Sequence, residues 1–220
     1  MFAPLRVTFH LDGAGVSYDP LEPIMLDGII TAAVSRFHVH GEAPGRYEEP
    51  DEIPLPLAKW HIGDVWGWRA SALLPDGEPM ESLQYWRKRF RQGHVGLTQG
   101  SPNTQNGVYR DWNAPLPLLL APRMVAYCVG DRKRLHKDLP RAITHIGRKR
   151  AYGKGRVNDI EIEEIDADYS LVRDGVAMRW LPTTSGTRDV RPRPPYWSAW
   201  DRVRCCEVGD EASAIASRCK

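Results

Sequence analysis

The sequence has no stretch that is long and apolar enough to cross a membrane. Its longest apolar run, APLPLLLAP at 114–122, contains three prolines and is far shorter than the roughly 20 residues that a membrane-spanning helix needs. The first residues, MFAPLRVTFHLDG, lack the basic start and the continuous apolar core of a signal peptide. We therefore expect a cytoplasmic protein that makes no contact with a membrane.

Cysteine is scarce, and the nucleotide-binding motifs are missing. The four cysteines, at 128, 205, 206 and 219, form no Cys-x-x-Cys pair, so we expect reduced thiols, no metal and no cofactor. A P-loop requires G-x-x-x-x-G-K-[ST] between a strand and a helix, and the most glycine-rich stretch does not match it. The 18 prolines and 19 glycines also disfavour a helical bundle.

The net charge is small, but it is unevenly distributed along the chain. The formal net charge of the 220 residues is +2. It is −8 for residues 1–81, +4 for 82–122, +9 for 123–156 and −3 for 157–220. This polarisation predicts a basic surface for a polyanion, formed chiefly by residues 123–156. The alternative is that folding scatters these cations over different faces.

Hydrophobic periodicity predicts the elements of the first half. Apolar residues alternate over 4–13, which predicts a half-buried strand, and recur at helical spacing over 24–37, with Asp27 in the first turn. A second alternating segment, 61–77, predicts another strand. The segment 81–113 fits neither period and is too long for an ordinary connection. We interpret it as a projecting insertion, for example a hairpin.

The second half repeats the strand–helix–strand order. The patterns predict a strand over 123–131, a helix over 131–147 and a strand over 157–165. Gly147 suits the position after the helix, while Pro140 either kinks it or marks a shorter helix that begins near residue 138. A further hairpin is expected to turn at Asp174 and Gly175.

These elements fit an α+β protein. We predict a ferredoxin-like (RRM-like) βαββαβ core with a glycine-rich loop and an inserted thumb-like excursion. The core with its C-terminal extension takes residues 1–81 and 114–220, and the inserted thumb-like region takes residues 82–113.

The stretch HIGRKRAYGKGRV at 145–157 contains three glycines, five Lys/Arg residues and a tyrosine. It follows a predicted helix, whereas phosphate-binding loops precede a helix, whose N-terminus attracts anions. Glycines allow close backbone approach, cations bind phosphates, and a tyrosine can stack on a base, so we expect a single-stranded RNA site. The simpler alternative is a solvated basic turn. The expected contacts are Gly147, Arg148, Lys149, Arg150, Tyr152, Gly153, Lys154, Gly155 and Arg156.

The segment IGRKRAYGKGRV resembles the glycine-rich loop of the repeat-associated RAMP proteins of CRISPR systems. The opening LRVTFHLDG…PIMLDGIITAAV and the late RPRPPYW further resemble the small RAMP subunit of type IV effector complexes. That subunit is similar to the 5′-handle-binding component of other multisubunit complexes. The resemblance covers 5–37 and 123–197, whereas residues 41–113 find no match.

This resemblance implies a noncatalytic subunit that binds and caps the 5′ repeat-derived handle of the CRISPR RNA. The implied partners are the CRISPR RNA, a backbone RAMP subunit and a large subunit, with target DNA near its protospacer-adjacent motif as a further candidate. A thumb-like hairpin in such subunits pins or kinks the RNA. Here the thumb-like region opens with YWRKRFR, which offers Arg87, Lys88, Arg89 and Arg91. Arg191 and Arg193 in RPRPPYW are secondary candidates.

Two other functions remain open on the residues alone. Some RAMP proteins are metal-independent endoribonucleases that use histidine as general acid or base, and FHVHG would place His38 and His40 on one face if extended. The resemblance argues against this function, because type IV systems that process their guide use a separate RAMP nuclease. The third function is a protein–protein adaptor, with some of the eight tryptophans as interface anchors.

Overall fold

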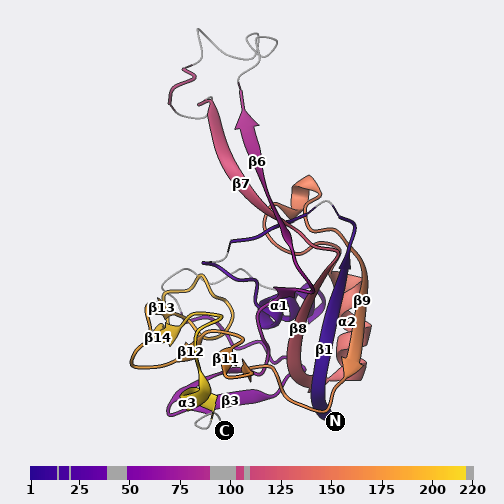
Figure 1. Cartoon of the computed structure of the whole chain (residues 1–220), viewed down its shortest axis with the longest axis vertical. Helices are drawn as coiled ribbons and strands as arrows, with labels where there is room; N and C mark the ends of the chain where they lie inside the picture. The colour runs from indigo at the N-terminus through magenta and orange to yellow at the C-terminus, as the bar shows by residue number, and fades with distance from the viewer. Residues whose placement is uncertain (14, 20, 39–48, 90–102, 107–109, 217–220) are drawn as a thin grey trace.

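A four-stranded antiparallel sheet with the order β5-β8-β1-β9 forms the centre of the molecule (Figure 1). Its strands are β1 (Phe2–Leu11), β5 (Leu74–Pro75), β8 (Arg123–Asp131) and β9 (Val157–Glu164). The structure is α+β with mostly antiparallel sheets and few helices, so the predicted fold class is confirmed at this level. This computed structural model describes residues 1–13, 15–19, 21–38, 49–89, 103–106 and 110–216.

One face of this sheet is apolar because alternate side chains of each strand point to the same side. Leu5, Val7 and Phe9 of β1 are fully buried in the main core. They share this core with Ile30 of α1 (Leu26–His38) and Leu135 of α2 (Arg132–Ala142). Each such side chain contributes roughly 1.5–3 kcal/mol by leaving water. The predicted strands 4–13, 123–131 and 157–165 and the helix 24–37 are therefore confirmed.

The predicted end of the second helix is wrong. The helix α2 ends at Ala142, and Ile143 leaves it with an extended backbone at φ −106° and ψ 104°. Gly147 is therefore not the residue that follows the helix. Pro140 lies in the last turn, where its missing N–H removes one intrahelical hydrogen bond close to the end of the helix, and the helix begins at Arg132 rather than near residue 138. Asp131 fixes this start, since its carboxylate accepts a hydrogen bond from the backbone N–H of Arg134 at 3.1 Å.

The predicted strand over 61–77 is also wrong. The chain instead forms a hairpin from β3 (Lys59–Ile62) and β4 (Val65–Trp68) before it reaches β5. Gly63 reverses the chain with a φ of +58°. Alternation continues on both sides of the turn, so the pattern alone could not show the reversal. A second hairpin, β10 (Val172–Arg173) and β11 (Val176–Ala177), turns at residues 174–175 as predicted.

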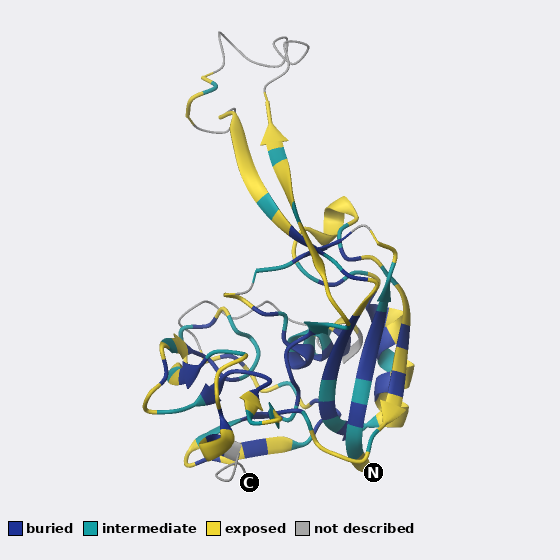
Figure 2. Ribbon diagram, in the orientation of Figure 1, coloured by how far each residue is buried: buried dark blue, intermediate teal, exposed yellow. Residues whose placement is uncertain are grey.

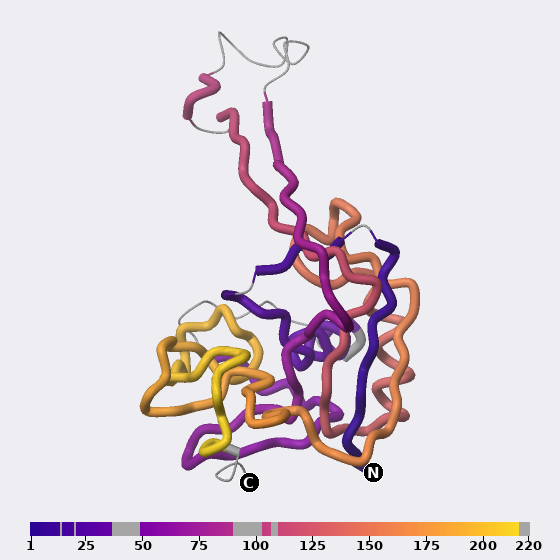
Figure 3. The backbone as a smooth tube through the Cα atoms, in the orientation of Figure 1, coloured from indigo at the N-terminus to yellow at the C-terminus, as the bar shows by residue number. Residues whose placement is uncertain are grey.

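The chain that follows β9 forms a lobe beside the central sheet, together with the β3–β4 hairpin (Figure 3). A small sheet is built here from β12 (Leu181–Pro182), β13 (Arg188–Val190) and β14 (Val203–Cys206), and α3 (Ser213–Ala216) follows. Its core joins Trp60 of β3 to Leu181 and Cys206. The lobe was not predicted as a sheet, because its strands are only two to four residues long.

A buried ion pair attaches this lobe to the core. Arg179 and Asp27 are both fully buried, with 3.2 Å between Nη1 and Oδ2. The Arg179 guanidinium also donates to the carbonyls of Trp68, Ala70 at 2.8 Å and Pro192. The hydroxyl of Tyr196 donates to Asp27 as well.

The pKa values in this cluster reflect burial opposed by pairing. Burial raises the pKa of Asp27, and the Arg179 charge opposes that rise. Burial alone would lower the pKa of Arg179, but the charges of Asp27 and Tyr196 and the hydrogen bonds to these residues together outweigh it and raise the pKa. Arg179 therefore stays charged, and its buried charge depends on Asp27.

Three cysteines, Cys128, Cys205 and Cys206, are buried and free. Burial raises the pKa of the Cys205 thiol to about 12. The fourth cysteine, at 219, lies outside the described residues. None of the helices in the described ranges is both long and apolar enough to cross a membrane.

The segment 81–113, whose pattern fitted neither a strand nor a helix, contributes to a long projecting hairpin. Its arms are β6 (Met80–Lys88) and β7 (Trp112–Leu120), which pair from Met80↔Leu120 to Lys88↔Trp112. The short strand β2 (Val16–Ser17) pairs with the base of β7. Most of both arms is exposed (Figure 2). Strand pairing therefore extends to residue 120, beyond the predicted 82–113.

Candidate nucleic-acid interface

The two ends of the glycine-rich loop, residues 146–148 and 155, form what we call its neck. The neck is hydrogen-bonded to the segment that follows β1. The N–H of Gly155 donates to the carbonyl of Gly15 at 2.8 Å, and the N–H of Ile146 donates to the carbonyl of Gly155 at 2.8 Å. The N–H of Arg148 donates to the carbonyl of Ser17 at 3.1 Å. Two segments far apart in sequence thus form one rigid unit at the top of the sheet.

The three glycines of this loop differ in what surrounds them. All three have a positive φ, +81° at Gly147, +75° at Gly153 and +66° at Gly155. A Cβ on Gly147 would lie 2.8 Å from the Ser17 carbonyl oxygen, and one on Gly155 only 2.0 Å from the Ile146 carbonyl oxygen. Gly153 has nothing within 4 Å. Close approach by another chain therefore remains open at Gly153, while the other two glycines serve the loop's own packing.

We expect Gly155→Ala to destabilise the protein more than Gly153→Ala. A left-handed backbone costs a residue with a Cβ about 1–2 kcal/mol, and both variants carry that cost. Only Gly155→Ala also forces the Ile146 carbonyl to move. Urea denaturation of the two variants measures the difference, with Gly153→Ala as the matched control. Equal losses of unfolding free energy would show that the neck is not tightly packed.

The tip of the loop presents cations and one aromatic ring. It contains the single 3₁₀ turn η3 (Arg150–Tyr152), entered through Lys149 at φ +59°. Tyr152 is 66% exposed. The predicted cations Lys149, Arg150 and Arg156 are exposed, and Lys154 is half-buried.

Arg148 is exposed but already engaged by two carboxylates. Its Nη1 lies 3.3 Å from Asp19, and its Nη2 pairs with Glu22. Glu22 also lies 4.0 Å from Arg188 of β13. The sequence places these acidic residues in the negatively charged first segment, far from the loop, so their pairing with Arg148 could not be predicted.

The loop tip packs against the hairpin through a cluster that we call the aromatic junction: Lys149, Tyr152, Trp86 and Trp112. The Nζ of Lys149 lies 3.9 Å from the centroid of the Trp86 ring, a cation–π contact. The ring centroids of Trp86 and Tyr152 are 4.0 Å apart, and those of Trp86 and Trp112 are 5.5 Å apart. Figure 1 shows the turn η3 beside the lower part of β6.

The predicted cations of the hairpin divide between its two faces, because side chains alternate along β6. Lys88 shares the face of Trp86, whereas Arg87 shares the opposite face with Tyr85. Arg87 donates to the Asn113 side chain at 3.1 Å. The last of the four, at position 91, lies outside the described residues. Arg89 is exposed just after β6.

Trp112 is a member of the junction that sequence reasoning missed. It comes from β7, and only the register of the hairpin brings it opposite Lys88. A tryptophan in an irregular, polar segment gives no signal of its partner. The place of Trp112 in the junction follows only from the pairing of residue 88 with residue 112 across the hairpin.

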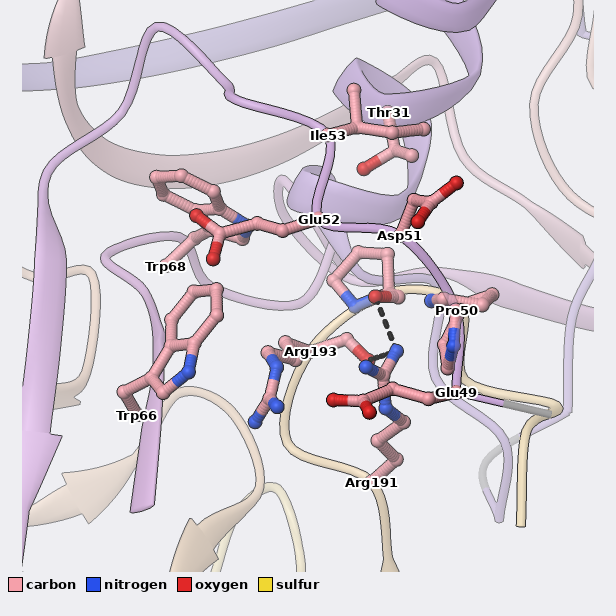
Figure 4. A pocket seen from close by; sticks show the side chains of 12 residues that line it. Thr31, Glu49, Pro50, Asp51, Glu52, Ile53, Trp66, Trp68, Arg191 and Arg193 are labelled. Atoms are coloured by element: carbon pink, nitrogen blue, oxygen red, sulfur yellow. Dashed lines mark hydrogen bonds between the residues drawn. The ribbon is translucent and has the colours of Figure 1, made fainter. Parts of the chain in front are cut away.

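Arg191 and Arg193 lie away from the loop, in a pocket of about 370 Å³ shown in Figure 4. Arg191 is only 3% exposed, and it donates to the Pro194 carbonyl at 2.5 Å. Burial lowers its pKa, and the charge of Arg193 adds to the shift. Arg193 pairs with Asp201 and lies 4.3 Å from the Trp66 ring. We leave both arginines out of the interface because their partners are internal.

The histidine pair of the alternative function lies largely outside the described residues. His38 is the last residue of α1, and position 40 lies outside the described ranges, as does the side chain of His38.

Fold and interface together define a small α+β protein in which a cation-rich glycine loop contacts the paired arms of a projecting hairpin, an arrangement suited to a polyanion. The family model of CRISPR type IV associated protein Csf3 matches residues 3–96 and 87–208. The chain therefore belongs to this family and is a type IV CRISPR-associated protein. A comparison with curated proteins gave no match.

Proposed function

We propose that this chain is a noncatalytic RNA-binding subunit of a type IV CRISPR ribonucleoprotein that caps the 5′ repeat-derived handle of the CRISPR RNA. The observation that carries the proposal is the aromatic junction, where Lys149 and Tyr152 meet Trp86. Membership of the Csf3 family supports the type IV assignment. The partners would be the CRISPR RNA, a backbone RAMP subunit and a large subunit in the cytoplasm, with target DNA close by.

We further propose that the central sheet is the ferredoxin-like core of a RAMP protein. Its strand order β9-β1-β8-β5 supports this, with α1 between β1 and β5 in sequence and α2 between β8 and β9. The core would comprise residues 1–81 and 114–220, and the inserted region 82–113 would act as a thumb. The hairpin pairing described above supports the thumb and carries it to residue 120.

The chemistry of the interface suits a single strand of RNA. Exposed cations at Lys149, Arg150 and Arg156 can neutralise successive phosphates, and the rings of Tyr152 and Trp112 can stack on bases. The open backbone at Gly153 leaves room for the strand. No general base is needed for this role, in keeping with a binding rather than a cleaving subunit.

The test compares RNA retention by assembled complexes. We expect Lys149→Ala with Arg150→Ala to weaken handle binding about tenfold and to reduce the salt slope by about 1.4, since each single-strand phosphate contact contributes about 0.7. Lys133→Ala with Arg134→Ala removes the same charge from exposed positions at the start of α2 and serves as the control. Arg148 is left intact, because its removal would also free Asp19 and Glu22.

Purified complexes of both double variants are assayed for bound RNA over a series of salt concentrations. Equal RNA retention and equal salt slopes would overturn the assigned interface. Incubation of the purified chain with labelled repeat RNA tests the noncatalytic role. Cleavage that is lost in His38→Ala or His40→Ala would replace the proposal with an endoribonuclease.

A further inference from the structure

A second cleft of about 630 Å³ lies between residues 22–23 and the C-terminal lobe. We propose that this cleft binds one unpaired nucleotide, as a site separate from the handle interface. Its volume falls within the usual range of roughly 300–1,000 Å³ for small-ligand sites. The residues that line it are Glu22, Pro23, Trp180, Arg188, Asp189, Val190, Tyr196, Trp197 and Arg202.

The aromatic lining offers faces for a base. Trp180 is buried at 5% exposure, and its ring stands edge-to-face with Tyr196, with centroids 5.5 Å apart. Trp197 is 48% exposed, which is unusual for so large an apolar ring and leaves it free to stack. Stacking of this kind accepts any base, because each one has a π face.

Two arginines supply charge at the cleft, and they differ in their engagement. Arg188 lies 5.5 Å from the Trp180 ring and donates to the Leu21 carbonyl. It also lies within 4.0 Å of Glu22. Arg202 donates to the Ser198 carbonyl at 3.3 Å, and no carboxylate of the described residues lies within salt-bridge distance of it. Arg202 is therefore the cation best placed to take a phosphate.

The carboxylates of the cleft are already neutralised. Asp189 pairs with Arg204 at 3.4 Å, and Glu22 pairs with Arg148 of the glycine loop. The pairing of Glu22 also makes the cleft adjoin the proposed RNA interface.

A buried donor adds to this picture. The indole N–H of Trp180 has no hydrogen-bond partner among the described residues, which is costly for a buried polar group. Nucleobases carry acceptor atoms along their edges, and such an acceptor is the partner that this N–H lacks. A peptide side chain would have to supply both an aromatic face and an anion to match the same lining.

The experiment uses the purified full chain and fluorescence anisotropy of labelled tetranucleotides, one of RNA and one of DNA with the same sequence, with AMP as a competitor. We expect Trp197→Ala and Arg202→Ala each to weaken tetranucleotide binding roughly tenfold or more, while Trp197→Phe retains most of it. The matched controls are Trp200→Ala and Arg134→Ala, exposed residues that do not line the cleft. Comparison of the RNA, DNA and AMP arms identifies which source of nucleotide the cleft accepts.

Failure of this proposal is distinguishable from failure of the handle interface. The Lys149→Ala/Arg150→Ala variant should keep its Trp197-dependent tetranucleotide binding even where it loses the handle. Tetranucleotide and AMP binding that is absent, or unchanged by both cleft variants, would overturn the proposal. Protection of Trp197 from oxidation in an assembled complex stripped of nucleic acid would overturn it too, since a protein subunit would then occupy the cleft.

Discussion

Arg179→Met is expected to lower the free energy of unfolding by about 3–5 kcal/mol, the usual cost of leaving one member of a buried ion pair without its partner. The substitution keeps the volume of the side chain but leaves the Asp27 carboxylate uncompensated. It also removes the donor to the carbonyls of Ala70 and Pro192, whereas the Trp68 carbonyl keeps the indole N–H of Trp60 as a partner. Chemical denaturation of the purified chain measures the loss.

The control is an exposed pair of the same chemistry. Asp189→Asn breaks the contact between Asp189 and Arg204, two side chains that are each about 60% exposed. This substitution should lower the free energy of unfolding by less than about 1 kcal/mol. The double variant Asp27→Asn with Arg179→Met should recover part of the loss, because no buried charge remains. A loss from Arg179→Met no greater than that from Asp189→Asn would refute the view that this pair holds the lobe.

Trp86→Ala is expected to weaken RNA binding by the assembled complex by roughly tenfold to a hundredfold. The ring holds Lys149 on one side and Tyr152 on another, so its loss removes a stacking surface and releases the loop from the hairpin. Stacking on one aromatic ring is worth about 1–3 kcal/mol per base. Filter binding with a labelled handle RNA measures the change.

The neighbouring residue provides the control for this variant. Tyr85 is 53% exposed and lies on the opposite face of β6, so Tyr85→Ala removes an aromatic ring of the same hairpin without touching the junction. We expect that variant to bind the handle RNA nearly as well as the parent. Equal weakening by both variants would mean that the whole hairpin, rather than the junction, contacts the RNA.

Elements with a strong period could be predicted from the sequence. The strand β1 alternates cleanly, α1 repeats at helical spacing, and β8 is continuously apolar, so each could be located within about two residues. The end of α2 was misplaced, because Gly147 is needed for its contact with Ser17 rather than for a helix cap. The β3–β4 reversal was hidden because both strands keep the same alternation.

The site could be located from the sequence only as far as its local composition allowed. The glycine-rich loop stood out by its cations, but the residues that decide its behaviour are distant in sequence. Asp19 neutralises Arg148, and Trp86 receives Lys149. These contacts depend on strand register and on how loops return to the sheet, which no local pattern specifies. Arg191 had the right residue type, yet it is buried.

The stability of the exposed hairpin arms depends on what packs against them. At its base, Leu118 and Leu119 are buried, whereas Leu83 and Tyr85 further along are more than half exposed. A two-stranded ribbon with both faces in water is only marginally stable by itself. Between the base and the aromatic junction, the backbone hydrogen bonds of the arms therefore open with little free energy, while those of the central sheet open only with global unfolding. The length of ordered ribbon is thereby set by what lies against it, and hydrogen exchange along the arms would read out assembly residue by residue.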